Sequence, residues 1–145
     1  MKVTIVIPPY INKGYYMPAL GVYVLARKLM DLDITVRVVD YSFDLMTGKM
    51  IASSRIYKEC ANDILTDNPD AICFSCNCMT ILPAMQISKL IKQTMNVPII
   101  IGGPIATTSA DEILKYTCVN YVIVGEGENS LPELILSLQK KKFAK

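Results

Sequence analysis

Five short apolar runs alternate with five segments of helical periodicity along the whole chain. The apolar runs are VTIVI (3–7), ITVRVVDY (34–41), DAICFS (70–75), VPIIIGG (97–103) and NYVIVG (120–125). Apolar residues three and four positions apart predict helices within residues 16–32, 55–65, 81–95, 109–116 and 130–141. Strict alternation of strands and helices predicts a parallel sheet with helices on both faces. No repeat or linker divides the chain, so we expect a single domain over residues 1–145.

The first two runs predict where their strands lie in the sheet. Residues 3–7 form an uninterrupted β-branched run, as in a strand covered on both faces. In the second run Arg37 lies between Val36 and Val38, and this alternation favours an edge strand. Five strands with the second at an edge match a flavodoxin-like (Rossmann-like), doubly wound α/β fold with strand order 2-1-3-4-5. The irregular stretch over 40–54 predicts a loop that reaches over the upper edge of the sheet.

Composition and charge exclude several classes of protein. With 52% hydrophobic and 19% charged residues, the chain is expected to fold. A net charge of +2 predicts no nucleic-acid partner, and we interpret the lysines at 140–142 as a solvated helix end. The apolar runs are far shorter than the roughly 18 residues that span a bilayer. Because Pro8-Pro9 interrupt the first run, we interpret it as the first strand of a cytoplasmic protein without a membrane partner.

The chain contains no histidine and five cysteines. Without histidine, His-based metal sites, Ser-His-Asp triads and imidazole proton shuttles are excluded. An odd number of cysteines without a secretion signal indicates reduced thiols in a cytosol. Cys73, Cys76 and Cys78 lack the spacing of zinc or iron–sulfur ligands. We therefore interpret them as buried apolar thiols and predict no metal ligands.

The residues directly after each strand are the candidates for ligand binding, because ligands of such folds bind outside the carboxyl ends of the strands. Two turns, Gly102-Gly103-Pro104 and Gly125-Glu126-Gly127, bring backbone without side chains to neighbouring strand ends. They indicate a large flat group close to the backbone, although one glycine alone could simply turn the chain. The predicted cofactor-binding residues are Pro9, Tyr10, Ser75, Cys76, Asn77, Met79, Thr80, Gly102, Gly103, Pro104, Gly125, Glu126 and Gly127.

Several polar residues near these turns allow two interpretations. Ser75 and Thr80 either cap a helix or hold the polar tail of a ligand. Asp40 could contact a ribose, but no Gly-x-Gly-x-x-Gly follows the first strand, so we favour an acceptor of backbone N–H groups. Glu126 and Glu128 could form an acid/base pair, but we favour charges at the start of a helix. No nucleophile–base set is present, so the chain alone is not predicted to be an enzyme.

Taken together and in this order, the strand-end sequences resemble the cobalamin-binding domain at the N-terminus of cobalamin-dependent radical S-adenosylmethionine enzymes. The similar segments are IVIPPY (5–10), MPALGVYVLA (17–26), AICFSC (71–76), PIIIGGPIAT (98–107) and VIVGEGENSLPEL (122–134). The resemblance covers about residues 2–138, and GGPIAT followed by VGEGE is its fairly specific part. The family usually has histidine where Ile105 stands, a departure that leaves the glycines of the loop intact.

The resemblance implies that the chain binds cobalamin and presents it to a radical S-adenosylmethionine domain, in cis or in trans, for methyl transfer or a related radical reaction. Many other cobalamin proteins place a histidine beneath the cobalt, which is impossible here because the chain has none. The resemblance therefore implies base-off cobalamin, with the dimethylbenzimidazole tail in a slot at the sheet edge. The catalytic domain would bind a 4Fe-4S cluster and S-adenosylmethionine.

The family's Cys-x-x-x-Cys-x-x-Cys motif is absent from this chain. We therefore expect the chain to be the N-terminal part of a larger protein or a stand-alone module. The alternative hypothesis is a flavodoxin-like module that binds a flavin, a nucleotide or a protein partner. Phosphorylation, as in response regulators, is disfavoured because the first strand lacks an acidic pair that would hold a metal.

Overall fold

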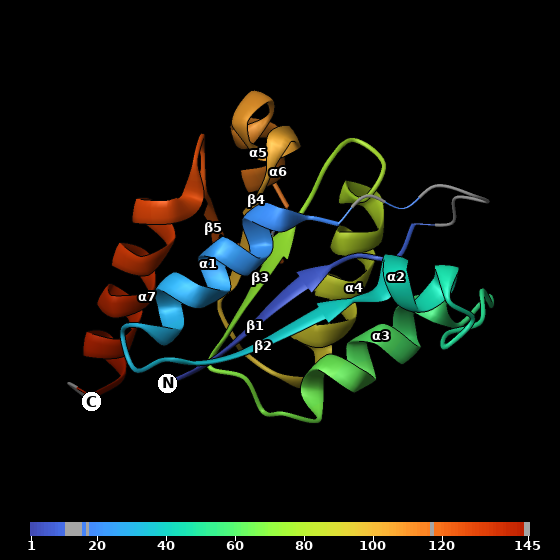
Figure 1. The fold of residues 1–145 in the computed structure, drawn as a ribbon, viewed down its shortest axis with the longest axis horizontal. Helices are drawn as coiled ribbons and strands as arrows, with labels where there is room; N and C mark the ends of the chain where they lie inside the picture. The colour runs from blue at the N-terminus through green and yellow to red at the C-terminus, as the bar shows by residue number, and fades with distance from the viewer. Residues whose placement is uncertain (11–15, 17, 117, 144–145) are drawn as a thin grey trace.

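The computed structural model describes residues 1–10, 16, 18–116 and 118–143. Within these residues, five parallel strands form one sheet in the order β2-β1-β3-β4-β5 (Figure 1). The strands are β1 (Lys2–Ile7), β2 (Thr35–Asp40), β3 (Ala71–Ser75), β4 (Ile99–Gly102) and β5 (Tyr121–Val122). The predicted flavodoxin-like, doubly wound fold and its strand order are therefore confirmed.

Helices cover both faces of the sheet. Helices α1 (Leu20–Met30) and α7 (Gly127–Phe143) lie together on one face, and α3 (Ile56–Leu65) and α4 (Ile81–Thr94) lie together on the other (Figure 1). The short helices α2 (Tyr41–Met46), α5 (Pro104–Thr108) and α6 (Ala110–Leu114) follow β2 and β4. None of the helices in the described ranges is long and apolar enough to cross a membrane.

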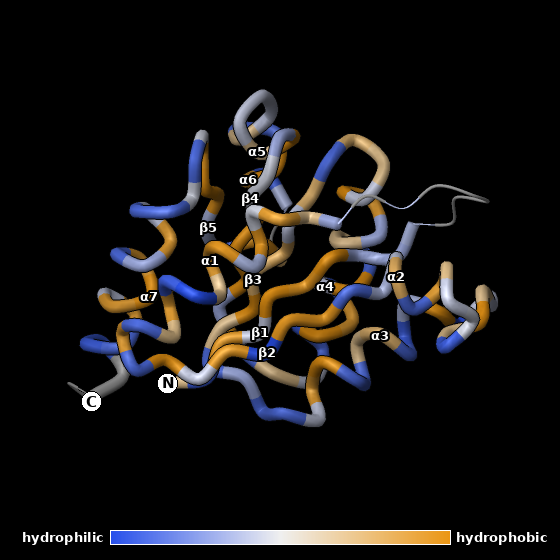
Figure 2. The backbone as a smooth tube through the Cα atoms, viewed as in Figure 1, coloured by the Kyte–Doolittle hydropathy of each residue, from blue (hydrophilic) through white to orange (hydrophobic). Residues whose placement is uncertain are grey.

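Alternating side chains along the central strands build a core on each face. In β1, Val3 and Ile5 belong to the core formed with α1 and α7, whereas Val6 belongs to the core formed with α3 and α4. In β4, Ile100 belongs to the core formed with α1 and α7, and Ile101 belongs to the core formed with α3 and α4. Figure 2 shows the strands as the hydrophobic centre of the molecule, with hydrophilic positions on the outer turns of the helices. Burial on both faces explains why the strand sequences are apolar almost throughout.

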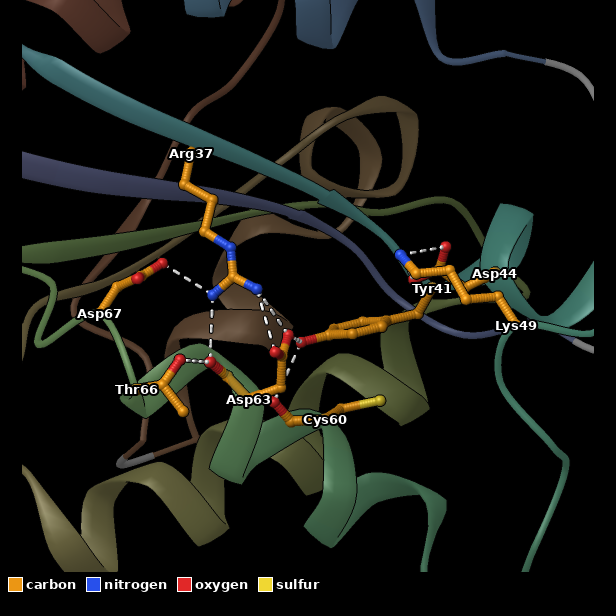
Figure 3. Close-up of polar contacts among 8 residues, drawn as sticks. All are labelled: Arg37, Tyr41, Asp44, Lys49, Cys60, Asp63, Thr66 and Asp67. Atoms are coloured by element: carbon orange, nitrogen blue, oxygen red, sulfur yellow. Dashed lines mark hydrogen bonds and ion pairs between the residues drawn. The ribbon is translucent and has the colours of Figure 1, made fainter.

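Arg37 identifies the edge strand, as its position in the sequence predicts. Its guanidinium donates to Asp63 Oδ2 over 2.9 Å and to Asp67 Oδ2 over 2.7 Å. The hydroxyl of Tyr41 donates to the same Asp63 oxygen over 2.7 Å and to Cys60 O over 3.1 Å (Figure 3). Tyr41 is buried, and burial together with the Asp63 carboxylate raises its pKa. The cluster therefore fastens β2 and the first residue of α2 onto α3.

The stretch over 40–54, predicted to be a loop, contains helix α2. Asp40 Oδ1 accepts a hydrogen bond from the Phe43 N–H over 2.9 Å and caps this helix. The loop prediction is therefore wrong for residues 41–46, because the last residue of the strand is itself the capping carboxylate of the helix. The same bond confirms Asp40 as an acceptor of backbone N–H groups.

The last strand and the last helix have bounds that differ from the prediction. Strand β5 is shorter than the predicted 120–125, although the Ile123 N–H still donates to Ile101 O over 2.8 Å. Gly125 then turns the chain with a φ of 75°, which favours glycine. Helix α7 begins at Gly127, earlier than the predicted Ser130, so its first turn lies at the carboxyl end of the sheet.

Candidate functional site

The turn after β1 is held by the start of α2. Ser42 Oγ donates to Pro8 O over 2.8 Å and accepts from the Tyr10 N–H over 3.1 Å. The hydroxyl of Tyr16 donates to the Asp40 carboxylate, and burial together with this carboxylate raises the pKa of Tyr16. Ser42 of α2 therefore holds the backbone at Tyr10, and Asp40 at the end of β2 holds the side chain of Tyr16.

The turn between β3 and α4 is closed by its own side chains. Asn77 Oδ1 accepts from the N–H groups of Met79 and Thr80 over 2.9 and 3.1 Å. Thr80 Oγ1 in turn accepts from the Asn77 N–H over 2.9 Å, and Thr80 is 4% exposed. Thr80 stands at the N-cap position of α4, but its hydroxyl bonds the preceding turn and caps no N–H of the helix, so the capping role is not found and contact with a ligand stays a prediction. Burial raises the pKa of the neighbouring Cys76 thiol to about 12, so this thiol is protonated at neutral pH.

The carboxyl ends of β3 and β4 are joined by close backbone contact. The Cys76 N–H donates to Gly102 O over 2.8 Å. Gly103 has a φ of 96°, and a Cβ added to it would lie 2.5 Å from Cys76 O. Gly103 is therefore required by the turn itself. At Gly102, by contrast, an added Cβ would meet Ile123 Cβ at 3.8 Å, an ordinary contact.

Gly103→Ala is expected to destabilise the fold by about 3 kcal/mol or more, because the new Cβ must displace the Cys76 backbone and alanine disfavours a positive φ. The free energy of unfolding in urea measures this effect. Gly102→Ala is the matched control, with an expected change within about 1 kcal/mol. Two variants of equal stability would contradict the special role of Gly103.

Two adjoining cavities open at the carboxyl end of the sheet. The first, here called the slot, has a volume of about 280 Å³ and lies between the sheet and helices α1 and α7. The second, here called the loop cavity, has a volume of about 450 Å³ and lies over the ends of β1 and β3 beside α2. Ala19, Ser75 and Pro104 line both cavities, so the two spaces are contiguous. The walls of the slot are mainly apolar side chains: Ile5, Val22, Leu25, Ile100, Ile123 and Leu131.

Most of the predicted site residues line these cavities. Those in the slot are Ser75, Gly102, Gly103, Pro104, Gly125, Glu126 and Gly127. Those in the loop cavity are Tyr10, Ser75, Cys76, Asn77, Thr80 and Pro104. Pro9 is buried and Met79 is 51% exposed, and neither lines either cavity. The structure therefore brings the predicted turns together, while contact of each residue with a cofactor stays a prediction.

Helices α1 and α2 supply walls that the sequence argument missed. Gly21, Val22 and Leu25 of α1 line the slot, and Ser42 and Met46 of α2 line the loop cavity. One signal was present in the sequence, because a glycine inside a helix costs about 1 kcal/mol and usually has a packing or functional reason. A Cβ at Gly21 would meet no atom within 4 Å, so no packing contact requires glycine there and the position borders open space.

The cysteines and glutamates near the cavities also have defined positions. Cys73 and Cys76 are buried as predicted, but Cys78 is exposed because it lies in the turn before α4, so its predicted burial is wrong. Glu128 lies in the first turn of α7 and Glu126 just before it, which supports charges at a helix start. Among the described residues, no group of three or more Cys, Asp or Glu side chains could hold a metal ion.

A doubly wound parallel sheet with glycine-lined turns and an apolar slot at its carboxyl end defines an α/β domain suited to a flat cofactor. The family model of the B12 binding domain matches residues 10–135, which is most of the chain. The chain therefore belongs to the B12-binding domain family. This result confirms the resemblance to a cobalamin-binding domain that the strand-end sequences indicate.

Longer proteins contain a similar domain. The uncharacterised methyltransferase PH0819 of Pyrococcus horikoshii is 25% identical over 152 residues, which cover 100% of this chain and 31% of the relative. A structure of the radical S-adenosylmethionine methyltransferase TsrM from Kitasatospora setae, with cobalamin and a 4Fe-4S cluster bound, has a TM-score of 0.78 and 18% identity, covering 97% of this chain and 25% of TsrM.

A second TsrM structure, with tryptophan substrate and an S-adenosylmethionine analogue bound, has a TM-score of 0.77 and 18% identity, covering 97% of this chain and 26% of TsrM. The similarity to TsrM is one of fold. The chain spans about a third of the length of PH0819, for which the covered share is 31%, and about a quarter of TsrM.

Proposed function

We propose that this domain holds base-off cobalamin, with the nucleotide tail in the slot and the corrin over the loop cavity, and presents the cofactor to a radical S-adenosylmethionine domain. The observation that carries the proposal is the slot, an apolar, glycine-lined space of about 280 Å³ that continues into the loop cavity. This shape fits a flat heterocycle attached to a larger ring. Membership of the B12-binding family supplies the identity of the cofactor.

The residues of the slot fit a benzimidazole nucleotide. Val22, Leu25 and Leu131 offer apolar surface for the faces of a heterocycle. Gly102 and Gly125 add no side chain, so the ligand can approach the backbone. When bound, cobalamin supplies a cobalt centre that can carry a methyl group. The chain's own residues position the tail and keep water from its apolar faces.

The chemistry of the available side chains supports the base-off form. The chain has no histidine, so no protein imidazole can replace the benzimidazole beneath the cobalt. Among the sulfur side chains after β3, Cys76 lines the loop cavity, but this residue is 1% exposed, and burial raises the pKa of its thiol in the free chain. Cys78 and Met79 are exposed and line neither cavity. When the tail lies in the slot, its benzimidazole is away from the cobalt. None of these sulfur side chains is expected to take its place as a ligand.

Exposed apolar side chains near the site support a partner domain. Six large hydrophobic residues at the carboxyl end of the sheet are more than a third exposed: Leu20, Phe43, Met46, Met79, Leu82 and Val124. They belong to the first turns of α1 and α4, to α2, to the turn before α4 and to the segment after β5, which surround the cavities. Exposed apolar groups around a cofactor site fit a surface that another domain covers. TsrM and PH0819, both longer methyltransferases, support a methyl-transferring partner that carries the 4Fe-4S cluster and binds S-adenosylmethionine.

Titration of the purified chain with hydroxocobalamin, and separately with flavin mononucleotide, tests the proposed function. We expect one equivalent of cobalamin to co-elute with the chain in gel filtration, with an altered corrin absorption spectrum. Flavin mononucleotide should elute freely. Binding of the flavin without binding of cobalamin would reject the proposal in favour of a flavodoxin-like module.

Electron paramagnetic resonance of the bound cobalt(II) form then tests the coordination. A coordinated nitrogen splits each cobalt line into three, so base-off cobalamin should give unsplit lines, because no benzimidazole or imidazole nitrogen reaches the metal. Free cob(II)alamin at neutral pH is the control that shows the splitting. Lines split into three in the complex would contradict the base-off form. Cys76→Ala should leave the spectrum unchanged, since its thiol is not expected to coordinate.

A further inference from the structure

One carboxylate that lines the slot has an oxygen without a hydrogen-bond partner. In the part of the chain that the structure describes, the buried side-chain oxygens without a partner are Thr4 Oγ1, Ser88 Oγ and Glu128 Oε2. Thr4 lies in β1 and Ser88 in α4, and neither lines a cavity. Glu128 lines the slot from the first turn of α7. Of these three oxygens in the described residues, only Glu128 Oε2 belongs to a side chain that a ligand in the slot can contact.

The protein around Glu128 supplies no hydrogen-bond donor for its buried carboxylate oxygen. The carboxylates of Asp63 and Asp67 are paired with Arg37, as expected for partly buried charges. Burying a carboxylate oxygen without a donor costs free energy, and the positive end of the α7 dipole offsets only part of that cost. Most of the slot walls are apolar side chains and glycines, and no donor of the described residues, the Ser75 hydroxyl in the slot included, is bonded to this oxygen. A donor carried by the ligand would satisfy this oxygen.

The chemistry of the tail limits which donor that is. In a benzimidazole nucleotide one ring nitrogen carries the sugar, and the other has no hydrogen in the neutral form. The ribose hydroxyls are therefore the O–H donors of the tail. Carboxylates bind ribose hydroxyls in other doubly wound folds. The terminal torsion of glutamate is broad and nearly two-fold, so a small rotation brings either oxygen toward the slot.

Resting on the proposed function, we infer that Glu128 determines specificity for the nucleotide tail, its carboxylate accepting a hydrogen bond from a ribose hydroxyl in the slot. The corrin ring then lies over the loop cavity and does not depend on this residue. Glu128 therefore distinguishes complete cobalamin from corrinoids that lack the nucleotide. Cobinamide, which has the corrin but no nucleotide, is the matched ligand.

Dissociation constants of cobalamin and cobinamide for the wild-type chain, Glu128→Leu and Glu128→Gln test this inference. Glu128→Leu should weaken cobalamin at least tenfold and change cobinamide less than twofold. Glu128→Gln keeps an acceptor oxygen and should lose less than Glu128→Leu. Glu133→Leu, an exposed carboxylate of the same helix, is the control with the same charge change and should bind both ligands as the wild type does.

Unfolding of each free variant in urea gives a second measurement, independent of the cofactor. Glu128→Leu should be at least as stable as the wild type, because it removes an unpaired buried oxygen. Equal weakening of both ligands would place the donor on the corrin and overturn the inference, as would unchanged cobalamin binding. A wild-type chain that binds neither corrinoid would overturn the proposed function itself, a result distinct from either of these.

Discussion

Replacing Gly21 with phenylalanine is expected to weaken cobalamin binding by at least two orders of magnitude without unfolding the domain. Gly21 lies in the first turn of α1 and lines the slot, and an added Cβ would meet no atom within 4 Å. A phenyl ring there occupies the space proposed for the heterocycle, whereas the helix backbone accepts the change. Phenylalanine also has a better helix propensity than glycine, so the free energy of unfolding should not fall. Equilibrium dialysis with hydroxocobalamin and urea unfolding measure the two effects.

Two further variants make this result specific to the slot. Val24→Phe places the same ring on an exposed position of the same helix that lines neither cavity, so it should bind cobalamin like the wild type. Gly21→Ala adds one methyl group and should raise the free energy of unfolding by about 1 kcal/mol. A folded Gly21→Phe variant with wild-type affinity would show that the tail does not enter between α1 and the sheet.

The strand order could be predicted because it depends on the alternation of apolar and charged residues, which can be read from the sequence alone. A charged Arg37 between two valines belongs at an edge, and its pairing with Asp63 and Asp67 satisfies it there. The start of α2 could not be predicted from apolar periodicity, since it depends on one hydrogen bond from the Phe43 N–H to Asp40. Short helices of this kind are specified by a cap more than by a hydrophobic face.

The sequence predicted the site residues that lie in the turns after the strands. It did not predict those that lie on helices and line the cavities. Val22 and Leu25 each pack in a core and also line the slot, so their apolar spacing indicates only burial. Gly102 and Gly103 look alike in the sequence, but only Gly103 has a positive φ and a close backbone neighbour. Glu128 was correctly placed at a helix start, but its unpaired oxygen becomes visible only when the slot around it is known.

Raising the pH from about 8 to about 10 is expected to lower the free energy of unfolding by roughly 4 kcal/mol under reducing conditions. Burial raises the pKa values of the Cys60, Cys73 and Cys76 thiols from 9.0 to about 12. In the unfolded chain these thiols ionise near pH 9, whereas in the folded chain they stay protonated. The unfolded state therefore gains about 1.4 kcal/mol per thiol over this range, and stability is lost progressively between pH 9 and about 12.

Other titratable side chains also affect how the free energy of unfolding depends on pH, but they do not reverse its direction. Burial also raises the pKa values of Cys118 and Tyr41, which act in the same direction, and lowers the pKa of Lys92, which acts in the opposite direction. A loss of this size is a large part of the roughly 5–15 kcal/mol that stabilises a typical domain. The free domain should therefore be markedly less stable near pH 10 than near pH 8.

Urea unfolding at the two pH values, on single variants, assigns the effect to the thiols. Cys73→Ala lowers stability at both pH values because it leaves a cavity, but it should remove about a third of the pH-dependent loss. Cys78→Ala changes the exposed thiol and should keep the full loss. A free energy of unfolding that stays constant from about pH 8 to about pH 10 would contradict the protonated, buried state of these thiols.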